Sequence, residues 1–223
     1  MQLIKLALVA GCGLVASTFA QRFDLKVRDD FFAGFSGDHA ALNRGMKACE
    51  DALKEDAGNA QALVWHGCGL FFQSGEAFQT GDSQKAVDLF QRGLKEMESA
   101  VTMAPDDVTV RIPRGATLLA GSRGIPPEMA RPLIEKALAD YEHALDLQAD
   151  YWSMLEVHSR GELLFGLADG YSRAGNQAKA QSYFERIQKE LPDTPYAKRA
   201  AIWLETKSLP RSQTGCIGCH TEK

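Results

Sequence analysis

The sequence predicts an all-α protein, built as a short and irregular stack of helical hairpins. Apolar residues recur at three- and four-residue spacing through most of the 223 residues, and no stretch alternates in the manner of a β-strand. Glycine and proline recur at 58, 75, 81, 105, 124–127, 175, 192 and 195, where we expect the chain to turn. Apolar residues make up 45% and charged residues 24% of the chain, with a formal net charge of −4. This is the composition of a globular protein without the basic face that nucleic acid requires.

Residues 1–20 are typical of a secretory signal peptide. Lys5 precedes an apolar run from Leu6 to Val15, and small residues lead to Ala20, after which we expect cleavage. The run is too short and too rich in glycine and alanine for a membrane span. A buried first helix is one alternative, and the resemblance of the residues before Cys12 to a bacterial lipobox makes a lipid anchor at Cys12 another. We therefore expect a mature chain exported to the bacterial periplasm.

Residues 161–194 form the clearest repeat unit. Ala168 and Ala180 are small where two helices would cross, and Gly175 would let the chain reverse between them. Tyr171 and Phe184 would fill the space between the helices. The pattern is completed by Leu164, Leu167, Ile187 and Pro192. In order and spacing these residues resemble the tetratricopeptide repeat (TPR), a helix-turn-helix unit of 34 residues.

The resemblance extends more loosely over residues 40–207. It implies a TPR-like α-solenoid domain at residues 21–207, with about three and a half hairpins, a final helix at 195–207 and a groove that binds a protein partner. Extra residues at 74–83, 122–131 and 152–160 depart from the 34-residue unit, and the last of these would lengthen the helix before Gly161. Residues 21–37 would add a helix whose Phe31, Phe32 and Phe35 pack on the first hairpin.

Two cysteines of the helical region, Cys49 and Cys68, flank the turn expected near residue 58. They lie at similar distances from that turn, so an antiparallel hairpin would place them at similar height. In an oxidising compartment a disulfide between them is feasible if their Cβ atoms face each other. The alternative is two separate buried thiols that act as small apolar side chains.

The tail at residues 208–223 contains the sequence Cys216-Ile217-Gly218-Cys219-His220. This C-x-x-C-H spacing is the attachment signature of c-type haem. Cys216 and Cys219 would form thioethers with the porphyrin vinyl groups, and His220 would be an axial ligand of the iron. The motif resembles that of c-type cytochromes, although here it lies close to the C-terminus and no ligand can follow it. We therefore expect one covalent haem c.

Three other interpretations of the tail remain. A structural zinc site usually has four ligands, and the tail supplies three. A thioredoxin-like dithiol would open a helix after a strand, and no strand is predicted. An unmodified tail would expose two adjacent thiols that oxidise readily.

The sixth iron ligand would come from the body, a partner or a second copy, or the position would stay open. His39, His66, His143, His158 and methionines such as Met154 carry suitable donor atoms. His158 is the preferred candidate, because it lies in the inserted segment before Gly161. Arg111, Arg114, Arg123 and Arg131 cluster around another insertion, where they would pair with haem propionates or an acidic partner, or form an ordinary solvated face.

Together these features predict an exported, monohaem, cytochrome-like protein. Its TPR-like body would dock on a redox protein or complex, and its haem would transfer electrons within a larger periplasmic assembly. The alternative is a periplasmic TPR scaffold that binds protein partners without haem. We expect no transmembrane segment after signal removal, and no acid–base pair, nucleophile triad or phosphate loop indicates an enzyme.

Overall fold

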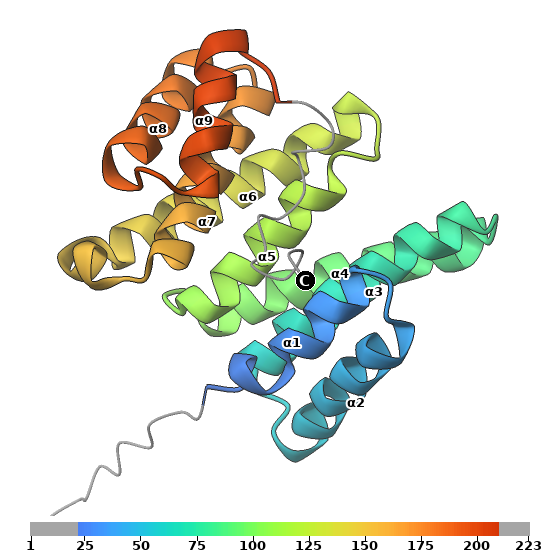
Figure 1. The fold of residues 1–223 in the computed structure, drawn as a ribbon. Coiled ribbons are helices and arrows are strands. Elements are labelled where there is room, and N and C mark those ends of the chain that lie inside the picture. The colour runs from blue at the N-terminus through green and yellow to red at the C-terminus, as the bar shows by residue number, and fades with distance from the viewer. Residues whose placement is uncertain (1–21, 210–223) are drawn as a thin grey trace, which may run out of the picture.

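The computed structural model describes residues 22–209, a stack of helices in which no described residue forms a strand (Figure 1). Along the described chain the helices are α1 (Asp24–Phe35), α2 (His39–Glu55), α3 (Ala60–Gln79), α4 (Ser83–Met103), α5 (Val108–Gly121), α6 (Pro127–Leu147), the 3-10 helix η1 (Ala149–Met154), α7 (Val157–Arg173), α8 (Gln177–Glu190) and α9 (Pro195–Thr206). The predicted all-α fold is confirmed.

Local sequence explains where most helices begin and end. In α2, α3, α4, α5, α8 and α9 the residue before the helix accepts a hydrogen bond from a backbone N–H of the first turn; these caps are Asp38, Asn59, Asp82, Asp107, Asn176 and Thr194. Gly81 and Gly175 have φ of +85° and +82°, a region that favours glycine, and they turn the chain after α3 and α7. The reversal predicted at Gly175 is confirmed. Gly75, also expected at a turn, instead lies inside α3.

Successive helices pack as antiparallel hairpins. α1 packs on α2, α3 on α4, α5 on α6 and α7 on α8, while α9 covers α8 and α7. The unit predicted at residues 161–194 corresponds to the α7–α8 hairpin, in which Ala168, Ala180 and Phe184 are fully buried. The predicted stack of helical hairpins is confirmed.

The odd-numbered helices form one layer of this stack, because each packs on the next odd-numbered helix. Their starts lie side by side. The Gln61 side-chain amide at the start of α3 donates to Asp107 at the start of α5 (3.1 Å). The Tyr196 hydroxyl near the start of α9 lies 2.9 Å from Nδ1 of His158 near the start of α7. We call this end of the stack the far end; it includes the connections at residues 56–59, 104–107, 148–156 and 191–194.

The ends of the odd-numbered helices also lie side by side, so these helices are parallel. Arg173, the last residue of α7, donates to the carbonyl of Leu119 near the end of α5 (2.7 Å). Trp203 near the end of α9 donates from Nε1 to the Ser172 hydroxyl near the end of α7 (2.9 Å). We call this the tail end; it includes the turns at residues 36–38, 80–82, 122–126 and 174–176 and the end of α9.

Two glycines allow α3 and α4 to touch along their backbones. A Cβ atom at Gly67 would lie 2.9 Å from the carbonyl oxygen of Gly93, and one at Gly93 would lie 2.8 Å from that of Gly67. Both separations are below ordinary van der Waals contact, so any side chain would push the helices apart. The two glycines therefore set the close packing of this hairpin.

The inserted segments have different structures. The residues at 74–83 extend α3 and α4, and their turn projects beyond the neighbouring helices at the tail end (Figure 1). The prediction that residues 152–160 lengthen the helix before Gly161 holds only for residues 157–160, because α7 begins at Val157. Residues 152–154 belong to η1, and the chain is extended at Leu155 and Glu156, where ψ is 144° and 151°.

The predicted N-terminal helix is α1, and its aromatic side chains pack on α3. The rings of Phe31 and Phe32 lie 5.1 and 6.0 Å from the ring of Trp65. The ring of Phe35 lies 4.9 Å from that of Phe72. The predicted helix is thus itself part of the first hairpin, with α2, and its phenylalanines join it to α3 of the second hairpin and to a core that extends to Trp203.

Candidate functional site

The predicted haem-binding residues Cys216, Cys219 and His220 lie outside the described residues, as do the signal peptide at residues 1–20 and Cys12. The structure does describe the point from which the tail leaves the body. α9 ends at Thr206, Lys207 is left-handed with φ of 56°, and Leu209 packs against the core. The chain therefore leaves the body at the tail end of the stack.

The preferred sixth-ligand candidate, His158, lies at the opposite end. It is half-buried near the start of α7, where its Nδ1 and the Glu162 carboxylate are both within 2.9 Å of the Tyr196 hydroxyl. α7 has 17 residues, so its two ends are about 25 Å apart at 1.5 Å per residue. A ligand role for His158 stays a prediction, and it would require the tail to cross that distance.

The other histidines of the described chain interact with carboxylates. Nδ1 of the buried His66 lies 2.5 Å from Glu96. Nε2 of His143 lies 2.7 Å from Asp106, and Nδ1 of His39 lies 3.3 Å from Glu76. Within residues 22–209, no three His, Cys, Asp or Glu side chains are grouped as a metal site would require.

Of the four clustered arginines, Arg114 is buried inside the stack and Arg111 is partly buried, so neither forms the ordinary solvated face that the sequence left open. Asp140 of α6 is fully buried, and its carboxylate accepts hydrogen bonds from Arg114 at 2.6 and 2.7 Å and from Arg111 at 2.9 Å. Arg114 also donates to Glu98 of α4 (2.9 Å). These guanidinium groups join α4, α5 and α6, and their hydrogen bonds go to carboxylates of the same chain.

The other two arginines are at the surface. Arg123 pairs with Asp169 of α7 at 2.5 Å, and Arg131 is exposed. Sequence reasoning missed the buried acceptor, Asp140. Its position offered a signal, because it is three residues after Ala137 and four before Ala144, and both alanines are fully buried on the apolar face of α6.

Cys49 and Cys68 are free thiols in the structure, and both are fully buried. The Cys68 sulfur lies 3.7 Å from the Met97 sulfur on α4 and 3.6 Å from the Pro113 carbonyl on α5, rather than being bonded to α2. Of the two arrangements compatible with the sequence, the structure has two separate buried thiols. Burial raises the pKa of Cys68 to about 12 and also raises the pKa of Cys49 strongly.

These thiols are therefore expected to be unreactive until the protein unfolds. In a mature Cys216→Ala/Cys219→Ala variant, a thiol reagent at pH 8 should modify no cysteine of the native protein, because the thiolate is the nucleophile and neither sulfur is accessible. After denaturation without reductant, the same reagent should modify Cys49 and Cys68 in full. Recovery of thiols only after reduction would instead show a disulfide.

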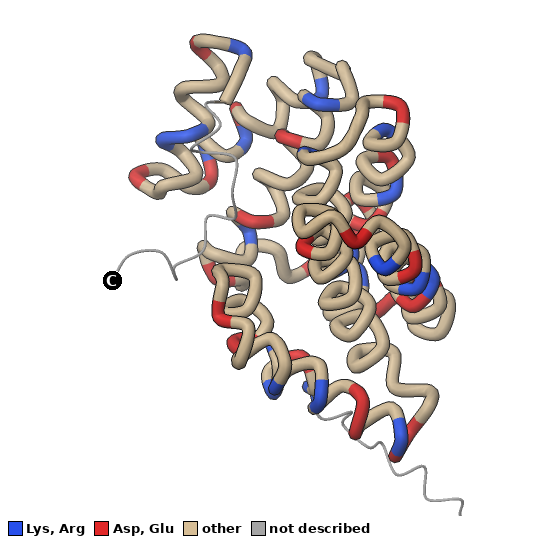
Figure 2. Tube along the Cα trace, turned by 90° about the vertical axis from the view of Figure 1, so that its right-hand side faces the viewer, with Lys and Arg blue, Asp and Glu red and all other residues tan. Residues whose placement is uncertain are grey.

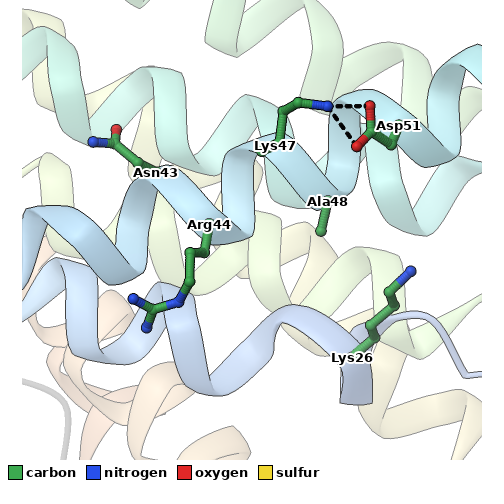
Figure 3. Close-up of a pocket in the computed structure, with 6 residues that line it drawn as sticks. All are labelled: Lys26, Asn43, Arg44, Lys47, Ala48 and Asp51. Carbon is green, nitrogen blue, oxygen red and sulfur yellow. Dashed lines mark hydrogen bonds and ion pairs between the residues drawn. The ribbon is translucent and has the colours of Figure 1, made fainter.

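A shallow hollow lies on the outer surface of α1 and α2 (Figure 3). It is lined by Lys26, Asn43, Arg44, Lys47, Ala48 and Asp51. Lys47 pairs with Asp51, and Arg44 pairs with Asp30 at 2.7 Å. Two of the three cations that line the hollow are therefore paired with carboxylates, and the third, Lys26, lies over the ring of Phe23 at 5.8 Å.

Acidic and basic residues alternate over the helices in the view of Figure 2, and neither sign dominates the face shown. None of the described helices combines the length and apolar character that a membrane span requires. Comparison of the chain with known protein families, curated proteins and solved structures finds no match.

Proposed function

We propose that the protein is an exported, monohaem, c-type cytochrome-like protein. Its helical body, which resembles a TPR domain, docks on a protein partner, and its tail carries a covalent haem for electron transfer within a larger periplasmic assembly. The observation that carries this proposal is the Cys216-Ile217-Gly218-Cys219-His220 motif in a chain that begins with a signal-like segment.

The donor set of the tail fits haem c. Cys216 and Cys219 supply two sulfurs with the spacing needed for the two vinyl groups, and His220 supplies an imidazole nitrogen beside them. Bound haem provides a one-electron iron couple. The role of the chain is to hold that group covalently, so that it stays attached even where a short tail encloses little of it.

The body supports the proposal in two ways. The hydrophobic core of the described residues is closed by α9, where Trp203 is 1% exposed and packs within the same core as the other helices. The parallel odd-numbered helices form a repeated surface of the kind that helical-repeat proteins use to bind proteins. A docking body joined to a redox tail would keep the haem close to the bound partner.

Co-expression with a cytochrome c maturation system tests the proposal. The purified mature protein should carry one haem per chain that survives denaturation, with a mass above that of the polypeptide and sharp absorption bands on reduction. The same chain expressed without the maturation system is the control and should be colourless. Colourless protein with two titratable tail thiols after co-expression would contradict the haem assignment and favour a scaffold that binds partners through its helical surface.

A further inference from the structure

The segment between α6 and α7 exposes several apolar side chains at the edge of the stack (Figure 1). None of the residues of η1 is buried. Three of the eight large apolar side chains that are exposed in residues 22–209 lie within residues 151–157; Met154, Val157 and Tyr151 are 82%, 45% and 40% exposed. A group of exposed apolar side chains, unlike scattered single ones, indicates an interaction site.

This segment is nevertheless held in a fixed position by Trp152, which packs against the core. The Trp152 Nε1 donates to Glu190 at the end of α8 (2.7 Å), and the Arg186 guanidinium lies over the indole ring, 4.8 Å from its centroid. Arg186 also pairs with Glu190 (2.6 Å). Because this side chain anchors the segment, Tyr151 and Met154 are presented to solvent without a large entropy cost of ordering the backbone when a partner binds.

Exposed carboxylates surround these apolar side chains. Residues 146–157 contain three acidic residues and no lysine, arginine or histidine. A fourth acidic residue lies in the connection after α8, which the bond between Trp152 and Glu190 holds next to η1. All four are exposed, and none forms an ion pair within the part of the chain that the structure describes; they are Asp146, Asp150, Glu156 and Asp193.

Few cations on the adjoining parts of α7 and α8 offset these carboxylates. Arg186 is paired with Glu190, Arg160 is half-buried, and Lys189 is exposed. A partner that covers the apolar side chains would therefore meet a predominantly negative rim. Acidic groups on that partner would be repelled, whereas lysine and arginine side chains would be attracted.

We propose that this surface docks a basic protein, one whose lysine and arginine side chains surround an apolar contact. We call it the η1 patch; it consists of Asp146, Asp150, Tyr151, Met154, Glu156, Val157 and Asp193. Met154 supplies the apolar centre together with its two apolar neighbours, and the four carboxylates form the rim, which is the usual anatomy of a protein interface. The inference goes beyond the proposed electron transfer, because docking at the η1 patch requires no haem.

The test measures the binding of a synthetic helical peptide of leucine and lysine to the full mature chain by isothermal titration calorimetry. Such a peptide has the apolar face and the basic rim that the η1 patch should accept. A leucine–glutamate peptide of the same length and pattern is the control ligand. Wild type should bind the lysine peptide, with an affinity that falls as the salt concentration rises, and should not bind the glutamate peptide.

A matched pair of double variants locates the binding. Met154→Ser/Glu156→Gln changes the η1 patch, and Glu128→Gln/Met129→Ser makes the same two changes at exposed residues in the first turn of α6, at the tail end. All four side chains are exposed, so both variants should fold as wild type does, which circular dichroism checks. The first variant should bind the lysine peptide about tenfold more weakly, because it lacks a methionine that binding would bury. The second should bind it as wild type does.

Equal binding of the lysine peptide by the two double variants, or equal affinity of wild type for the two peptides, would overturn the proposal. Absence of binding by wild type would overturn it as well. Dimerisation of wild type in sedimentation velocity that is lost in Met154→Ser/Glu156→Gln would replace the basic partner with a second copy of the chain. None of these measurements requires haem, so their failure leaves the haem proposal intact, and colourless protein that binds the lysine peptide would overturn only the haem proposal.

Discussion

Replacing Cys216 and Cys219 with alanine is expected to abolish covalent haem completely and to leave the helical content and unfolding midpoint of the body unchanged. Each thioether bond needs a cysteine sulfur, so the double variant has no attachment point for the porphyrin. Haem staining after denaturing electrophoresis and intact mass measure attachment. Thermal unfolding followed by circular dichroism measures the body.

The body is expected to be unaffected because its last helix is already packed. Trp203 of α9 is 1% exposed, and its ring stacks on Phe184 with 4.5 Å between ring centroids. Its Nε1 also donates to the Ser172 hydroxyl, so both the apolar and the polar parts of the side chain are satisfied. A large loss of helicity in the Cys216→Ala/Cys219→Ala variant would contradict this separation of body and tail.

The matched control applies the same substitution to the other two cysteines of the mature chain. Cys49→Ala/Cys68→Ala should retain covalent haem and should lower the free energy of unfolding by about 1 kcal/mol per site, because each fully buried sulfur leaves a small cavity. The two double variants thus have opposite expected effects. Loss of haem from the Cys49→Ala/Cys68→Ala variant would show that the body contributes to attachment.

Substitution of Arg114 by methionine is expected to cause a large loss of stability, about 3–5 kcal/mol in the free energy of unfolding. Arg114 donates two hydrogen bonds to Asp140 and one to Glu98, and its side chain is 6% exposed. Without it, the fully buried Asp140 carboxylate keeps only Arg111 as a charged partner. Urea unfolding of the mature protein measures the effect.

Lys136→Met is the control for this prediction, because Lys136 pairs with the same Glu98 at the surface. The side chains of that pair are 43% and 54% exposed, and exposed ion pairs contribute about 0.2–1 kcal/mol. We expect a correspondingly small change. If Arg114→Met cost no more than Lys136→Met, the buried arginine would not stabilise the α4–α5–α6 packing as inferred.

Helices and turns were predictable where short-range sequence determines them. The unit at residues 161–194 shows this, because helical periodicity, the glycine at 175 and the small residues at the crossing all lie within one hairpin. The prediction was wrong at residues 152–156, which form the end of η1 and an extended break at Leu155 instead of the start of α7. Gly75 was misplaced for the converse reason, because packing of α3 on α4 outweighs the weak helix propensity of one glycine.

The environment of charged residues could not be read from spacing. Arg111 and Arg114 look like any basic surface cluster in the sequence, yet both are directed inward to Asp140 of α6, which lies 26 or more residues away in the chain. The same limit applied to Cys49 and Cys68. Similar height in a hairpin left open whether the sulfurs face each other, and in the structure the Cys68 sulfur contacts α4 and α5.

By itself, the sequence determined the helical character of the chain and the turns that glycine and helix-capping residues mark. It also supplied the C-x-x-C-H motif on which the proposed haem chemistry depends. Each of these features involves residues close together in the chain. The tertiary structure alone decided that the odd-numbered helices are parallel, which charges are buried, and at which end of the stack the described chain ends after α9. Those properties depend on contacts between helices far apart in the sequence, and such contacts form only when the whole stack packs.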